Sequence, residues 1–196
     1  MLLAFVIILR KEELKLKKSE KVLKLVVLAM FVALGVIISP LLRVEGMCPM
    51  AHFINIVCSV LMGPWYSLLC AISISIIRMS LMAIPPIAIT GAVFGAFFSG
   101  VFYRVSKGSL IFAVLGEVIG TGIIGAILSY PVMTIFWGKT GLTWLFYVPS
   151  FIGGTLIGGT IAFLFLKKLA SIGRLSHIQA RLSSKVYSGK DKQNDK

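Results

Sequence analysis

The chain has 196 residues, of which 58% are hydrophobic and only 14% are charged, and its mean hydropathy is +0.97. This composition excludes a soluble domain and is typical of a polytopic helical membrane protein. The formal net charge is +13, but the basic residues flank the apolar stretches, so we attribute the charge to contact with an anionic leaflet rather than to nucleic-acid binding.

Apolar stretches follow one another from residue 22 to residue 166. A transmembrane helix needs about 20 mostly apolar residues, so the sequence predicts an all-α bundle of six membrane spans and no separate soluble catalytic domain. The expected spans are Val22–Ser39, Met50–Gly63, Trp65–Ile84, Pro86–Tyr103, Ser109–Tyr130 and Leu142–Leu166.

Lys and Arg are concentrated in residues 1–24, between the fourth and fifth spans, and after residue 166. By the positive-inside rule both ends of the chain are therefore cytoplasmic. We expect residues 1–21 to form a basic cytoplasmic segment, residues 22–166 the membrane domain, and residues 188–196 a disordered tail. In residues 167–187 apolar side chains recur every three or four positions among basic ones, which predicts an amphipathic helix on the cytoplasmic surface.

Four polar residues inside the spans are the first candidates for a binding site. His52 and Asn55 lie three residues apart, Glu117 is the one carboxylate within the expected spans, and Thr121 follows it by one helical turn. At about 1.5 Å per residue, they lie roughly 12 to 19 Å from the cytoplasmic face. Unpartnered polar groups in hydrocarbon cost several kcal/mol, so this layer predicts either a ligand site or hydrogen bonds between helices alone.

Arg78 lies about 20 Å along the third span, too deep for a surface residue. The sequence leaves three interpretations open: a pair with Glu45, a pair with Glu117, or a side chain that reaches outward. Because the second span is short, we expect the segment Arg43–Met50 to dip into the outer leaflet above the polar layer and act as a lid.

Aromatic residues near the outer ends of the spans are either interface anchors or a wall for a flat ligand. Tyr130 and Trp144 are the candidates for ligand contact among them.

Cys48, His52 and Glu45 suggest a metal site, but a fourth ligand is missing and we predict none.

Two apparent nucleotide-binding motifs lack the sequence context that nucleotide binding requires. The G-x-G-x-x-G pattern of residues 120–125 lies inside a span with no preceding strand, so we interpret it as a helix-packing surface. Gly138, Lys139 and Thr140 resemble the end of a P-loop whose first glycine is absent, because Met133 stands there. We therefore predict no catalytic residues, no cofactor on this chain and no ATPase activity of its own.

Four separated motifs resemble the ThiW family of substrate-binding S components of energy-coupling-factor (ECF) transporters. They are Pro49-Met-Ala-His-Phe-Ile-Asn55, Gly63-Pro-Trp-Tyr66, Gly116-Glu-Val-Ile-Gly-Thr-Gly-Ile-Ile-Gly125 and Ser129-Tyr-Pro131. The resemblance implies a six-helix prokaryotic cell-membrane protein that binds a small neutral heterocycle and is not an enzyme. The implied ligand is the hydroxyethylthiazole moiety of thiamine.

The same resemblance implies partners. S components dock on a transmembrane coupling subunit driven by two ATP-binding cassette ATPases, and docking uses small residues in an Ala-x-x-x-Ala pattern, which Ala29 and Ala33 match. Two departures, Met50 in place of a Gln and Met79–Pro86 in place of a Gly-rich stretch, leave other ligands open, including thiamine, its pyrimidine half or another vitamin. A standalone proton-coupled transporter that uses Glu117 is the alternative outside this class.

Overall fold

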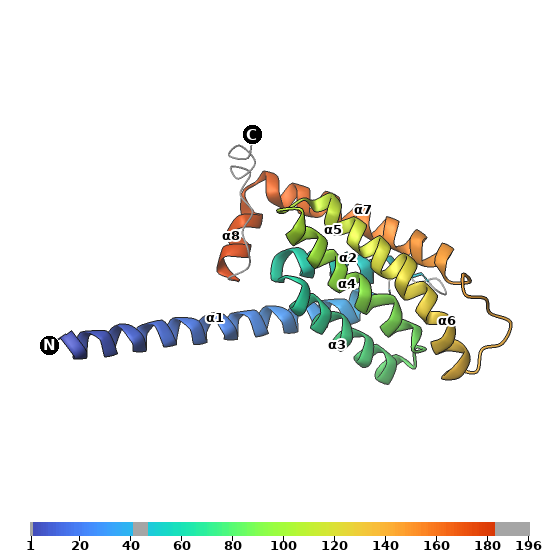
Figure 1. The fold of residues 1–196 in the computed structure, drawn as a ribbon, viewed down its shortest axis with the longest axis horizontal. Helices are drawn as coiled ribbons and strands as arrows, with labels where there is room; N and C mark the ends of the chain where they lie inside the picture. The colour runs from blue at the N-terminus through green and yellow to red at the C-terminus, as the bar shows by residue number, and fades with distance from the viewer. Residues whose placement is uncertain (1, 41–46, 183–196) are drawn as a thin grey trace.

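The structure, a computed structural model, describes residues 2–40 and 47–182, with side chains from residue 19 onward. In these ranges it is helical and has no strand, which confirms the predicted all-α bundle. Figure 1 shows a long N-terminal helix that leads into the bundle. The elements are α1 (Leu2–Ile38), α2 (Pro49–Met62), α3 (Pro64–Met82), α4 (Ile87–Val105), α5 (Leu110–Glu117), η1 (Val118–Gly125), α6 (Ala126–Ile135), α7 (Val148–Ser171) and α8 (Arg174–Arg181).

Five helical stretches in the described part are long and apolar enough to cross a membrane, and α2 is a sixth, shorter apolar helix. The chain is therefore a multi-pass membrane protein, as predicted. Two boundaries differ from the prediction. The fifth span continues to Ile135, and the last one begins at Val148 rather than Leu142, because Pro149 fits the first turn of a helix and Gly141 (φ 76°) turns the preceding chain.

The α4 helix lies at the centre of the bundle and packs against α2, α3, α5 and η1. Glycines allow this close approach, as the small-residue pattern predicted. A Cβ atom added at Gly120 would lie 2.8 Å from the Cα of Gly95, so the backbones of η1 and α4 are in direct contact there.

The C-terminal residues do not form one uninterrupted surface helix. Helix α7 continues to Ser171, Gly173 takes a left-handed conformation (φ 70°), and α8 then packs back toward the bundle. Leu175 and Leu182 join the apolar core. Gln179 is 1% exposed and donates hydrogen bonds to the Val60 carbonyl (2.9 Å) and the Tyr103 hydroxyl (3.0 Å). The amphipathic pattern thus serves protein packing; residues 183–196 lie outside the described part.

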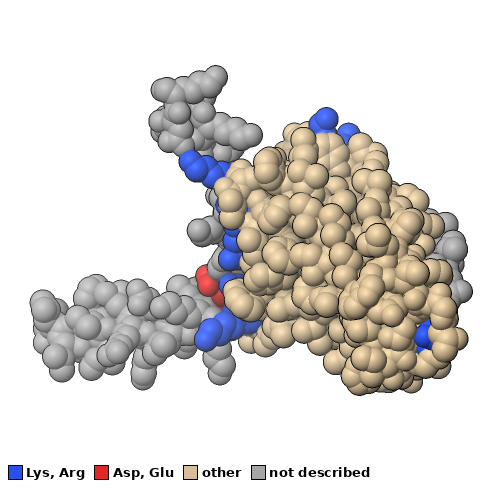
Figure 2. Space-filling model, turned by 45° about the vertical axis from the view of Figure 1, so that its right-hand side comes forward, with Lys and Arg blue, Asp and Glu red and all other residues tan. Residues whose placement is uncertain are grey.

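The surface separates into an uncharged body and a basic end. Figure 2 shows mostly uncharged residues, with several of the visible Lys and Arg at the end where α1 enters the bundle. Large apolar side chains, such as Leu69, Ile111 and Leu164, are more than half exposed, as expected for a lipid-facing surface.

Candidate functional site

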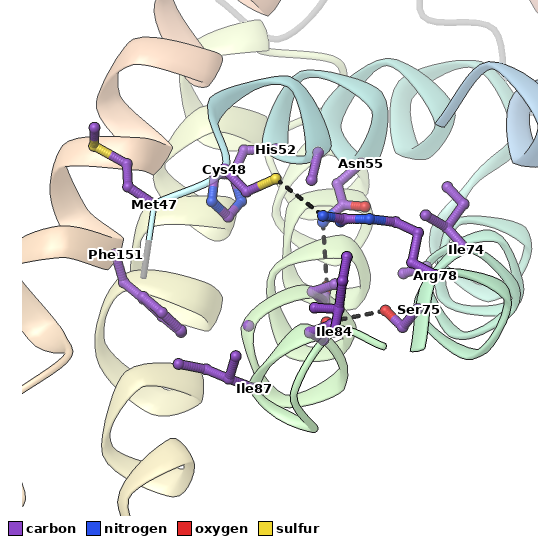
Figure 3. Close-up of a pocket in the computed structure, with 15 residues that line it drawn as sticks. Met47, Cys48, His52, Asn55, Ile74, Ser75, Arg78, Ile84, Ile87 and Phe151 are labelled. Carbon is purple, nitrogen blue, oxygen red and sulfur yellow. Dashed lines mark hydrogen bonds between the residues drawn. The ribbon is translucent and has the colours of Figure 1, made fainter. Parts of the chain in front are cut away.

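A cavity opens between the ends of the helices that lie away from α8, the outer ends by the predicted orientation. It is bounded by α2, α3, α4, α7 and the residues that precede α2, and its empty space measures about 650 Å³ when the space open to the outside is included. Figure 3 shows its labelled side chains around a common space. The lining residues are Met47, Cys48, Ala51, His52, Asn55, Ala71, Ile74, Ser75, Arg78, Ile84, Ile87, Ala88, Gly91, Ala92 and Phe151.

The predicted polar layer is joined by hydrogen bonds to one carboxylate oxygen. Oε1 of Glu117 lies 2.9 Å from Nδ1 of His52, 3.1 Å from Nδ2 of Asn55 and 3.2 Å from Oγ1 of Thr121. All four residues are at most 5% exposed. The prediction that these four residues lie together is therefore confirmed, although they come from three elements: α2, α5 and η1.

Only two of these four residues reach the cavity. His52 and Asn55 line it, whereas Glu117 and Thr121 are fully buried behind them. The Glu117 carboxylate is thus a positioning group for the two α2 side chains in this structure, and its second oxygen, Oε2, is buried with no hydrogen-bond partner among the described residues.

The carboxylate fixes which atoms His52 and Asn55 present. Nδ2 of Asn55 donates both to Glu117 and to the Ala92 carbonyl (3.2 Å), so the amide nitrogen must face these two acceptors. The amide oxygen Oδ1 remains as an acceptor without a hydrogen bond to a described residue. Nδ1 of His52 bonds to the same carboxylate oxygen, so its other ring nitrogen, Nε2, is left for a different partner.

A π-helix places Glu117 and Thr121 behind the cavity. It occupies Val118–Gly125, directly after Glu117 in a helical stretch that runs from Leu110 to Ile135. Such wide turns are frequent at functional sites. Gly95 on α4 makes room for them, since a Cβ there would overlap the Thr121 hydroxyl and approach the Glu117 carboxyl carbon to 2.7 Å.

Arg78 extends from α3 into the cavity wall and is 5% exposed. Its Nη2 donates to Sγ of Cys48 at 3.5 Å (Figure 3), and its Nε has no partner among the described residues. Of the three interpretations left open by the sequence, an outward-reaching side chain and a pair with Glu117 are wrong, because Arg78 is buried and Glu117 bonds to His52 instead. Glu45 lies outside the described residues.

Tyr130 and Trp144 contact each other rather than the cavity. Their ring centroids are 4.6 Å apart, Trp144 is 55% exposed, and neither residue lines the cavity. The aromatic ring in the wall is that of Phe151, which is 4% exposed and lies against Gly91 and the ring of Tyr147.

Several lining residues were not singled out from the sequence. Three of those on α4 are small, Ala88, Gly91 and Ala92, and their signal was the three- and four-residue spacing of one helix face. The expected lid is only partly described: Met47 and Cys48 line the cavity, while residues 43–46 lie outside the described part.

The two predicted docking residues lie away from the cavity. Ala29 and Ala33 are exposed and line an apolar groove between α1 and α3. Its other lining residues are Leu25, Leu28, Val32, Val36, Ile37, Ser73 and Ile77.

Comparison with known proteins gives one family. Residues 25–172, about three quarters of the chain, match the model described as thiamine-precursor transporter protein (ThiW). No curated protein and no solved structure matched. The matched range includes the cavity, the Glu117 network and the groove of α1. The chain therefore belongs to the ThiW family of thiamine-precursor transporters.

Proposed function

We propose that this protein is the substrate-binding subunit of an ECF-type importer and that it binds the hydroxyethylthiazole moiety of thiamine. The ligand is captured from the outside, and ATP hydrolysis in partner subunits moves it inward. The observation that carries the proposal is the cavity, whose walls are apolar except for a few converging polar groups, the usual composition of a site for a small organic ligand.

The arrangement of polar atoms suits a small heterocycle with one hydroxyl group. The Asn55 amide is held in place by Glu117 and the Ala92 carbonyl, so its oxygen Oδ1 can accept the proton of a ligand hydroxyl. The ring of Phe151 offers an apolar face on the α7 side for a flat ring.

Energy coupling would come from other subunits. In this proposal the chain itself binds no cofactor, and a coupling subunit with two ABC ATPases supplies the driving force. The exposed groove at Ala29 and Ala33 supports such an interaction, since small residues four apart allow a partner helix to approach closely.

Equilibrium binding to the purified protein in detergent tests the ligand. We expect compounds with the thiazole ring to bind more tightly than thiamine or the pyrimidine precursor. Asn55→Ala should weaken the binding of the alcohol by about 1–3 kcal/mol, the usual cost of an unsatisfied buried partner. Equal affinity for the three compounds, or tighter binding of the pyrimidine, would contradict the thiazole assignment.

Uptake by cells with and without the coupling subunit tests the mechanism. Concentrative uptake should require the subunit, and Ala33→Trp should reduce it strongly while leaving ligand binding unchanged. Leu34→Trp is the matched control, because Leu34 is exposed on the same helix but does not line the groove. Uptake that persists without the coupling subunit and collapses with the proton gradient would favour the standalone transporter instead.

A further inference from the structure

Arg78 is the one permanently charged side chain among the described residues that line the cavity. It is 95% buried, and its described polar contact is a 3.5 Å hydrogen bond to Sγ of Cys48, a weak acceptor. Nε of the guanidinium is buried with no hydrogen-bond partner in residues 19–40 and 47–182. The cavity therefore contains a cationic group with most of its donors unused by the described chain.

A buried charge of this kind requires an opposite charge. Leaving an ionised group in a low-dielectric environment without a partner costs several kcal/mol even after relaxation. No carboxylate among the described residues pairs with Arg78, because Glu117, the carboxylate beside the cavity, bonds to His52 instead. Glu117 also lies behind the cavity wall, with Oε1 already bonded by three donors.

The position of Arg78 relative to the other polar groups suggests how the ligand lies. In Figure 3 the guanidinium extends from α3 across the cavity toward Cys48, while His52 and Asn55 come from α2 and Phe151 from α7. A flat ring beside Phe151 can thus place one polar substituent near the guanidinium. The planar donor fork of Arg matches the oxygens of a carboxylate or phosphate and can bind them in a bidentate manner.

We infer that Arg78 binds an anionic oxygen group of the ligand, so that this site prefers a thiazole bearing a phosphate or carboxylate over the uncharged alcohol. This inference rests on the proposed function and narrows its ligand class. It also gives a reason for rejecting thiamine, because the cationic thiazolium ring would lie in the same cavity as the guanidinium.

Binding of three related compounds tests the inference: hydroxyethylthiazole, its phosphate ester and the corresponding thiazole carboxylate. We expect at least one of the two anions to bind the wild-type protein about 10- to 100-fold more tightly than the alcohol, as charge-assisted hydrogen bonds are among the stronger ones. The phosphate and carboxylate arms show which anionic group fits the cavity.

Variants at Arg78 test whether this residue causes the preference for the anions. Arg78→Gln should abolish the preference for the anion while binding of the alcohol persists, which also reports a folded protein. Arg78→Lys should keep part of the preference, because it retains the charge but not the fork. Ser75→Ala is the matched control, since Ser75 lines the same wall on the same helix and carries no charge.

Each other outcome overturns the inference in a distinguishable way. Equal or tighter binding of the alcohol would refute the anion preference and leave the thiazole proposal intact, whereas no binding of any thiazole would refute both. If the Arg78→Gln variant kept the anion preference unchanged, a group other than Arg78 would be responsible for that preference. If Glu45→Gln created an anion preference that the wild type lacks, Glu45 rather than the ligand would be the counter-ion of Arg78.

Discussion

The outer and inner halves of the bundle are filled in different ways, and α2 passes through both. Its first turns carry His52 and Asn55, which line the cavity and bond to Glu117. Its later turns, from Ile56 to Met62, are buried in an apolar core that includes Leu166 and the α8 residue Leu175. One half therefore contains the cavity and its hydrogen-bond network, and the other is packed with apolar side chains.

The two halves therefore have different roles: the outer half contains the binding cavity, and the inner half closes the bundle beneath it. In the outer half, a few hydrogen bonds around one carboxylate orient the side chains that line the cavity, beside an apolar cluster of Ala126, Met133, Tyr147 and Phe151. In the inner half, apolar packing and the Gln179 hydrogen bonds close the bundle below the cavity. The cavity is thus closed off from the end of the bundle at which α8 lies.

The largest effect is expected when the centre of the outer network is removed. Glu117→Ala leaves the donors of His52, Asn55 and Thr121 without their shared acceptor. Breaking such a buried pair costs about 3–5 kcal/mol, and we expect a clearly lower unfolding temperature in detergent together with lost ligand binding. Glu117→Gln, which keeps one acceptor oxygen, should lose less. Wild-type stability of Glu117→Ala would show that the network does not hold the outer half together.

A smaller loss is expected from crowding the same network. Gly95→Ala places a methyl group where the Thr121 hydroxyl and the Glu117 carboxyl lie. Overpacking of this kind costs about 1–3 kcal/mol, and thermal unfolding and ligand affinity should both decrease. Gly153→Ala is the control, because its Cβ would meet one neighbour, Met47 Sδ, at an ordinary 3.5 Å. Equal effects of the two variants would contradict a specific role for the α4 contact.

A substitution in the inner half should lower the stability of the protein without changing its ligand affinity. Gln179→Leu removes the hydrogen bonds to Val60 and Tyr103 and leaves the buried Val60 carbonyl without this donor. We expect a loss of about 1–2 kcal/mol in stability and unchanged ligand affinity. Ser176→Ala, on the exposed side of α8, should have no measurable effect. Weaker ligand binding in Gln179→Leu would mean that the two halves are coupled in the resting state.

The sequence alone predicted the helical class, the approximate spans and the polar layer. These succeeded because apolar length and the cost of buried polar groups are local properties that the chain displays directly. It also predicted that glycines mark close helix contacts, which the approach of Gly120 to Gly95 confirms.

The rotation of each helix about its axis and the irregular backbone segments could not be predicted from the sequence. Depth along a helix follows from residue count, but depth did not indicate that Glu117 lies behind the cavity while Arg78 lies in its wall. The π-helix after Glu117 has no strong sequence pattern. The start of α7 was misplaced because residues 142–147 are apolar enough to continue a span, and the backbone turn at Gly141 decides otherwise.

The smallest effect is expected at the aromatic pair that the sequence placed in the site. Trp144 stacks on Tyr130 away from the cavity and is 55% exposed, so Trp144→Ala should change ligand affinity by less than about 0.5 kcal/mol, as is usual for surface substitutions. Phe151→Ala is the comparison, because its ring is buried in the cavity wall and its loss should weaken binding clearly. If Trp144→Ala weakened binding as much as Phe151→Ala, the ligand site would extend from the cavity to the segment between α6 and α7, and the outer half would close over its ligand from that side.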